Sequence, residues 1–171
     1  MFYTGIGSRS TPIEVCAKMT QIARAFDKVG WVLRSGAAGG ADAAFERGVS
    51  GDNKQIFLPW PGFNGSTSGH AHQSTAAFTM AAELHPAWGR CSSVSRKMHA
   101  RNMYQVLGSD LKTPSSLVIS WTPGGKYIGG TAQAMRLAMQ HDIPIFNLGD
   151  PQALVCLRAW WFENVNLTTA P

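Results

Sequence analysis

The sequence predicts a single α/β domain built on a doubly wound, mainly parallel β-sheet. Short apolar runs alternate with longer segments of helical spacing, which is typical of βαβ units. Glycines gather directly after several of these runs, where the ligand-binding turns of such a sheet lie. The 171 residues, with an apolar fraction of 44%, have the size and composition of one ordinary domain. We therefore expect one domain over residues 1–171.

The apolar runs predict the strands, which we place at 2–6, 31–34, 55–58, 117–121 and 144–147. The segment between the first two begins at Pro12, carries apolar residues at helical spacing, and ends at Gly30. Further helices are expected at 41–48, 71–84, 94–107, 131–140 and 151–162. Gly108 suits the left-handed cap of the helix at 94–107.

Charge and cysteine content limit the class of partner and the compartment. Fifteen Lys and Arg residues against ten Asp and Glu give a net charge of +5, which modestly favours an anionic partner. The three cysteines are widely spaced, which indicates neither a disulfide framework nor a zinc cluster. No run approaches the ~18 apolar residues of a membrane span, so we expect a cytoplasmic protein with no membrane partner.

Three glycine-rich segments follow the first, second and fourth predicted strands, and each leads into a helix. The free N–H groups and positive dipole of a helix N-terminus form an anion site, and glycine lets a phosphate approach the backbone. Together the segments predict one shared site for a phosphate-bearing nucleotide. The ligand-binding residues expected from them are Gly7, Ser8, Arg9, Ser35, Gly36, Gly39, Gly40, Asp42, Pro123, Gly124, Gly125, Lys126, Gly129, Gly130 and Thr131.

Some of these residues have a second interpretation. Asp42 would bind a ribose hydroxyl or a base edge, or would be an acidic residue that favours the helix dipole. Lys126 and Tyr127 would form a flexible flap over the ligand, or an ordinary solvated loop. Arg101 and Asn102 are further candidates, because neighbouring apolar residues place them near the margin of the buried side of their helix.

Aromatic and histidine residues offer additional candidates for ligand contact. Trp60 and Phe63 would stack on a base, worth ~1–3 kcal/mol, or would pack their loop against the domain. His70 and His72 do not face a common point at a helix start, so we expect no metal and no cofactor. The sequence also lacks a nucleophile elbow, a Walker loop and a paired-carboxylate signature.

Several motifs, in this order and spacing, resemble those of a known superfamily. They are Gly5-Ile6-Gly7-Ser8-Arg9, Ser35-Gly36-Ala37-Ala38-Gly39-Gly40-Ala41-Asp42, Arg101-Asn102-Met103, Leu107-Gly108-Ser109-Asp110 and the helix opening Gly129-Gly130-Thr131. The chain resembles, over nearly its whole length, the Rossmann-like superfamily of the Smf-type DNA-processing proteins and the "lonely guy" phosphoribohydrolases (SLOG). It is most similar to the small stand-alone DNA-processing forms encoded by phages.

The resemblance implies a Rossmann-like fold and a glycine-lined ligand site. The phosphoribohydrolases carry a catalytic glutamate three residues after the threonine of their Pro-Gly-Gly-x-Gly-Thr motif, where this chain has Ala134. That departure argues against ribosyl hydrolysis and against an enzyme. The DNA-processing branch loads recombinase onto single strands, which makes single-stranded DNA a second partner to consider.

Three hypotheses follow. The leading one is a non-catalytic binder of a nucleotide, such as a signalling nucleotide; the alternative is a binder of single-stranded DNA. The third is a hydrolase of an N-glycosidic or phosphate bond, with Asp42 or Glu83 as acid–base candidate. The cluster Trp160-Trp161-Phe162 would belong to the core or form the contact of a homo-oligomer, and a closing helix that covers the sheet favours the core.

Overall fold

A five-stranded, all-parallel sheet forms the centre of the protein in the computed structural model, which describes residues 1–71 and 73–165. The strands are β1 (Phe2–Gly5), β2 (Val32–Ser35), β3 (Lys54–Ile56), β4 (Val118–Ser120) and β5 (Ile145–Asn147). Their spatial order is β3-β2-β1-β4-β5, so the direction of winding reverses between β1 and β4. This confirms the predicted doubly wound α/β class. His72 lies outside the described residues.

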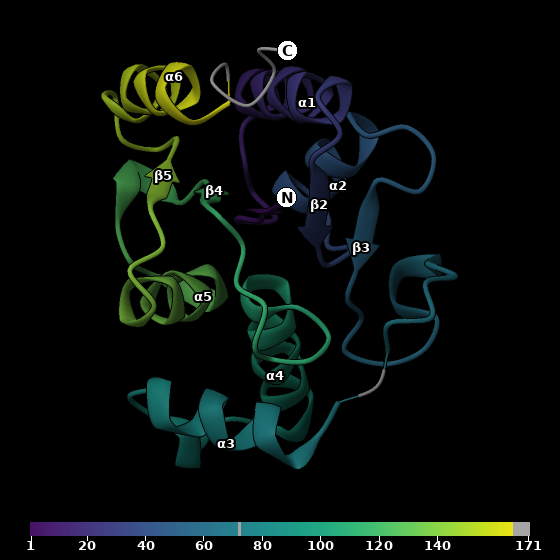
Figure 1. Ribbon diagram of the computed structural model, residues 1–171. Coiled ribbons are helices and arrows are strands. Elements are labelled where there is room, and N and C mark those ends of the chain that lie inside the picture. The colour runs from purple at the N-terminus through teal and green to yellow at the C-terminus, as the bar shows by residue number, and fades with distance from the viewer. Residues whose placement is uncertain (72, 166–171) are drawn as a thin grey trace.

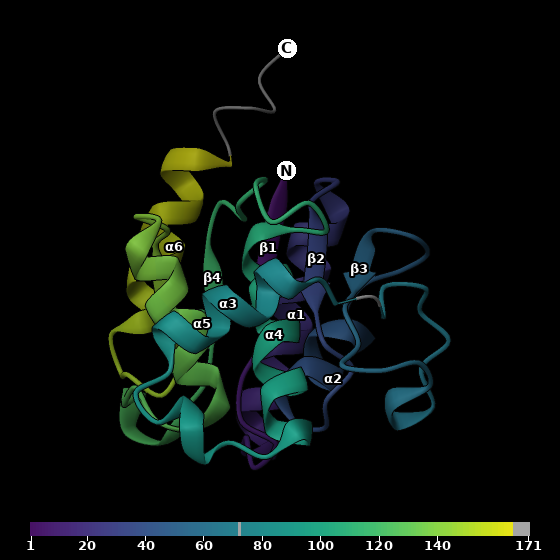
Figure 2. The ribbon, with the colours of Figure 1, turned by 90° about the horizontal axis from the view of Figure 1, so that it is seen from below.

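Helices cover both faces of the sheet (Figure 1). One face carries α1 (Ile13–Lys28), α2 (Ala41–Arg47) and α6 (Ala153–Asn164), and the other carries α4 (Ser93–Leu107) and α5 (Gly129–Gln140). The remaining helix, α3 (Thr75–Leu84), packs on α4 and α5 on the side away from the sheet (Figure 2). Two separate apolar clusters result, one on each face of the sheet.

Alternation along the strands distributes side chains between these two clusters. Tyr3 and Leu33 are fully buried on the face covered by α1, while Val118 is buried on the face covered by α4. Thr4, the neighbour of Tyr3, points to the α4 side, where its Oγ1 donates to the carbonyl oxygen of Gln105 at 2.6 Å. This buried bond fixes α4 against β1, beside the point where the winding reverses.

The aromatic residues of α6 pack mainly inward. The ring centroids of Trp161 and Phe26 are 4.7 Å apart, and those of Trp160 and Trp31 are 5.8 Å apart, both in edge-on arrangements. Phe162, by contrast, is 65% exposed. Two of the three aromatic residues therefore belong to the layer between α6 and α1, and the third lies at the surface.

One helix boundary differs clearly from the sequence prediction. The helix expected at 71–84 begins only at Thr75, because the side chain of Ser74 caps it by accepting the N–H of Ala77 at 3.3 Å. Before this helix, His70 makes an isolated parallel bridge with Phe57. The other boundaries coincide with the expected ones or shift by one or two residues. Within residues 1–71 and 73–165, no helix combines the length and apolar character needed to cross a bilayer.

Candidate functional site

A hollow of about 500 Å³ opens at the carboxyl ends of β1 and β4, where the winding of the sheet reverses. Its walls come from the turn after β1, the first turn of α2, one side of α4 and the N-terminus of α5. We call it the crevice. Ligands of open α/β sheets bind at this kind of position. The predicted site residues that line it are Gly7, Ser8, Arg9, Asp42, Arg101, Asn102, Pro123, Gly129, Gly130 and Thr131.

Other predicted residues lie behind the wall and hold it in place. Ser35 is fully buried, and its Oγ donates to the carbonyl oxygen of Gly5 at 2.7 Å. The carbonyl oxygen of Gly36 accepts a 2.6 Å hydrogen bond from Nη1 of Arg101. Gly40 has φ of 72°, and a side chain there would press on the backbone oxygen of Arg9, so this position supports the turn after β1.

The remaining predicted residues stand apart from the lining. Gly39 is exposed and has open space around it. Gly124, Gly125 and Lys126 belong to a short 3-10 turn and its cap, and the carbonyl oxygen of Lys126 accepts from Oγ1 of Thr122 at 2.6 Å. The predicted flap is thus tied back to the end of β4 rather than placed over the crevice.

Sequence reasoning missed most of the α4 wall. Besides Arg101 and Asn102, this helix contributes Ser95, Met98, His99 and Gln105 to the lining. The signal was present, because positions 95, 98, 99, 102 and 105 follow the three-to-four-residue spacing of one helix face.

The turn after β1 fits tightly between two other elements. A Cβ at Gly7 would lie 2.7 Å from the Cβ of Ala41 and 2.9 Å from the backbone oxygen of Trp121. The N–H of Ser8 donates to that same oxygen at 3.0 Å, and the N–H of Ala41 donates to the carbonyl oxygen of Ser8 at 3.3 Å. These amides are already engaged within the protein, which corrects the expectation that every glycine-rich junction presents bare amides to a ligand.

The N-terminus of α5 is different. A Cβ at Gly129 or Gly130 would meet nothing within 4 Å, and both residues are exposed at the edge of the crevice. Nδ2 of Asn102 donates to the carbonyl oxygen of Gly130 at 3.0 Å and so fixes this end of α5 to α4. The first N–H groups of a helix lack intrahelical acceptors and carry the positive end of its dipole. This junction therefore places backbone N–H groups that lack intrahelical acceptors at the edge of the crevice.

A buried ion pair forms part of the wall of the crevice. Nη1 of Arg101 lies 3.6 Å from Oδ2 of Asp42, and their side chains are 6% and 3% exposed. Burial raises the pKa of Asp42 to about 6, although Arg101 and the backbone of Ala38 and Gly7 act in the opposite direction. Burial lowers the pKa of Arg101, and Asp42 opposes that shift. Asp42 is thus occupied by a cation and by backbone donors.

Several polar atoms of the lining residues are buried without a hydrogen-bond partner in the described part of the chain. They are Nε of Arg101, Nε2 of Gln105 and Nδ1 of His99. Unsatisfied buried donors cost about 1–3 kcal/mol each, so they are rare and call for an explanation. The first two are donors by chemistry. An anionic oxygen in the crevice would satisfy them, and Arg9 adds a further cation at the exposed rim.

The two alternative acid–base candidates lie in different places. Glu83 lies on the exposed surface of α3 and does not line the crevice, whereas Asp42 does. Ala134, the residue at the position of the phosphoribohydrolase glutamate, is fully buried in the cluster beneath α4 and α5. Of the aromatic candidates, Phe63 is buried and meets Trp60 edge-on at 5.1 Å, so these two residues pack their own loop.

Comparison with known proteins gives one solved structure of similar fold. No protein-family model matches the chain, and no curated protein sequence matches it. The structure of DNA processing protein A from Helicobacter pylori, a protein with a single-stranded DNA binding mode, superposes with a TM-score of 0.56 at 21% identity. The match covers 86% of this chain and 64% of that protein, so the chain spans less than two thirds of its length. This chain thus shares its Rossmann-like fold.

Proposed function

We propose that the crevice binds a phosphate-bearing nucleotide without cleaving it, with a phosphate at the N-terminus of α5. The observation that carries this proposal is the meeting of three groups of donors at one hollow. These are the open backbone of Gly129 and Gly130, the unsatisfied donors of Arg101 and Gln105, and the rim cation Arg9. A phosphate presents several anionic oxygens and so suits more than one of these groups at once.

The size and the apolar part of the crevice suit the rest of a nucleotide. Its volume of about 500 Å³ falls within the range of about 300–1,000 Å³ typical of small-molecule sites. Ile6, Met98 and Ile128 supply apolar surface within the same lining. A base or sugar would pack against these side chains while the phosphate lies against α5.

Single-stranded DNA is the second candidate ligand, and two observations favour it. The Helicobacter pylori protein of similar fold binds single-stranded DNA, and this chain carries a net charge of +5. The motif resemblance to small stand-alone DNA-processing forms supports the same candidate. One nucleotide of the strand would then occupy the crevice, with Arg9 at the rim beside the next phosphate.

Calorimetry with a panel of mono-, di- and cyclic nucleotides, beside an oligothymidylate, tests both candidates. A free nucleotide in the crevice predicts saturable binding below ~100 μM to members of the first group, whereas a strand binder prefers the oligonucleotide and weakens steeply with salt. Gly130→Ala should lower either affinity several-fold, because the new methyl group stands in open space at the α5 N-terminus. Gly39→Ala, which also meets open space but lies outside the lining, is the matched control.

Absence of binding to every member of the panel would reject the proposal, and so would equal effects of the two glycine substitutions. The proposal that no bond is cleaved is tested separately. Nucleoside monophosphates incubated with the protein should remain intact, and release of free base would favour the hydrolase alternative instead.

A further inference from the structure

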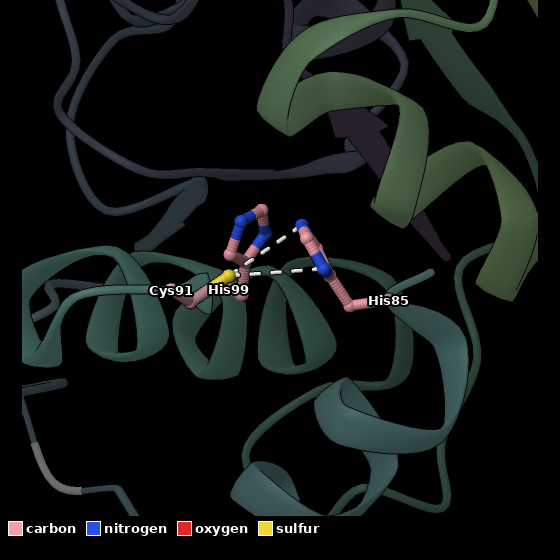
Figure 3. Close-up of side chains that lie close together, drawn as sticks. All are labelled: His85, Cys91 and His99. Atoms are coloured by element: carbon pink, nitrogen blue, oxygen red, sulfur yellow. Dashed lines mark hydrogen bonds between the residues drawn. The ribbon is translucent and has the colours of Figure 1, made fainter. Parts of the chain in front are cut away.

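Two histidines and a cysteine come together beside the crevice, although they are spread along the sequence. His85 follows α3, Cys91 follows the short 3-10 turn Trp88–Arg90, and His99 lies on α4. One potential ligand atom from each residue lies within 4.8 Å of the others. Figure 3 shows the two imidazole rings and the sulfur directed toward a common region between the loop and the helix.

The spacing is close to that of a tetrahedral metal site. Zinc binds histidine nitrogen at about 2.0–2.1 Å and cysteine sulfur at about 2.3 Å, so tetrahedral angles place these two atoms about 3.6 Å apart. Sγ of Cys91 lies 3.7 Å from Nδ1 of His85 and 3.7 Å from Nε2 of the same ring. The centroids of the His85 and His99 rings are 4.5 Å apart. Small side-chain rotations would bring three ligand atoms around one ion.

A second, independent feature supports a ligand at this place. His99 is 8% exposed, and its Nδ1 has no hydrogen-bond partner in the described part of the chain. Gln133 on α5 lies beside this ring, and its Oε1 is likewise buried without a well-formed hydrogen bond. Metal-bound histidines usually donate their other ring N–H to an oxygen acceptor, which Gln133 Oε1 would supply.

We propose that His85, Cys91 and His99 bind one divalent transition-metal ion of the Zn²⁺ class, with water in the fourth position. Two imidazoles and one thiolate form a borderline-soft ligand set that prefers such an ion to Mg²⁺ or Ca²⁺. The thiolate also offsets part of the positive charge of the ion. Binding through His85 Nδ1 replaces the hydrogen bond that this atom accepts from the N–H of Ala87 at 3.1 Å.

The site differs from the sequence expectation of no metal and does not depend on nucleotide binding. His99 also lines the crevice, so an ion held here would lie at its α4 wall. The sequence signal was weak, because the spacings of six and eight residues between the three ligands match no compact zinc motif. Packing of the loop against α4 creates the cluster.

Titration of the chelator-treated full-length protein with Co²⁺ tests the proposal directly. One equivalent should bind and give both a thiolate-to-cobalt charge-transfer band and the visible bands of tetrahedral cobalt, and Zn²⁺ should bleach them. His85→Ala should weaken Co²⁺ binding at least tenfold, whereas His141→Ala, at an exposed histidine after α5, should not. Absence of the charge-transfer band, or its survival in a folded Cys91→Ser variant, would overturn the proposal.

Alkylation of the unmodified protein provides a second test that needs no variant. Zn²⁺ should slow the reaction of Cys91 with iodoacetamide at least tenfold, as followed by peptide mass spectrometry. Cys156 is exposed on α6 and serves as the internal reference, whose rate should not change. Equal rates at Cys91 with and without Zn²⁺ would refute the proposed site.

Discussion

Nη1 of Arg101 lies 3.6 Å from Oδ2 of Asp42, and both side chains are buried in the wall of the crevice. The same nitrogen donates to the carbonyl oxygen of Gly36 at 2.6 Å, so one guanidinium joins α4 to the turn after β2 and to α2. Desolvation offsets much of the attraction in such a pair, but removing one partner leaves the other charge buried alone. Loss of either partner should therefore destabilise the fold and leave an unpaired charge in the wall of the crevice.

Loss of this pair should appear in a double-mutant cycle. Arg101→Met is expected to lower the free energy of unfolding by about 3 kcal/mol, because Asp42 loses its partner in a buried place. Asp42→Asn in the same chain should recover more than half of that loss. Urea denaturation followed by circular dichroism measures both values. If the changes in unfolding free energy caused by the two single substitutions add up to that of the double variant within about 0.5 kcal/mol, the two residues are not coupled.

The tight fit of the turn after β1 leads to a stability prediction. Gly7→Ala should destabilise the protein by about 1–3 kcal/mol, because the new Cβ would lie 2.7 Å from that of Ala41. Gly39→Ala is the control, since its Cβ meets no atom within 4 Å and its φ is not positive. Thermal unfolding of both variants measures the difference. A Gly7→Ala protein as stable as the control would contradict the packing described for this turn.

The rim cation should act on affinity rather than on folding. Arg9 is exposed and lines the crevice, so Arg9→Ala should leave the melting temperature unchanged and weaken oligonucleotide binding. If Arg9 contacts one phosphate, the negative slope of the logarithm of the association constant against the logarithm of salt concentration should become shallower by about 0.7 in Arg9→Ala. Fluorescence anisotropy across a salt series measures the slope. Arg158→Ala, on the exposed surface of α6, is the comparison variant, and an equal change in it would assign the effect to net charge alone.

The raised pKa of Asp42 predicts a pH dependence of anion binding. As the pH falls from 7.5 to 5.0, the protonated side chain loses its negative charge, so affinity for an oligonucleotide should rise several-fold, on the order of 1 kcal/mol. A phosphodiester does not titrate in this range, and the ligand charge therefore stays constant. Histidines also gain charge on acidification, so the test is the difference from Asp42→Asn. The same rise in that variant would exclude Asp42 as its source.

The sequence was sufficient for the class of the fold and for the location of the crevice. Short apolar runs that alternate with helical patterns indicate strands, and the carboxyl ends of parallel strands meet at one edge of the sheet. Gly7 and Gly130, which follow different strands, therefore line the same hollow. Local signals also predicted where helices end, as at Gly108, which directly follows α4. Its φ of 77° is positive as expected, but its ψ of 178° lies outside the left-handed helical region.

Features that depend on tertiary packing could not be predicted in this way. The apolar neighbours of Arg101 predicted a place near the margin of the buried side of its helix, but contacts with Asp42 and Gly36 bury it. The amides of Ser8 and Ala41 were expected to be free, yet internal carbonyl oxygens accept from them. In each case the partner lies far along the chain, so no local pattern could identify it.

Backbone amide NMR most directly tests the central claim that one anionic ligand meets several elements at the crevice. During titration with the best nucleotide or oligonucleotide of the panel, the amide signals of Arg9, Gly130 and Thr131 should shift together and fit one dissociation constant. Residues of α6, which does not line the crevice, should not shift. Shifts confined to one of these elements, or centred on α6, would contradict a shared site at the carboxyl ends of β1 and β4.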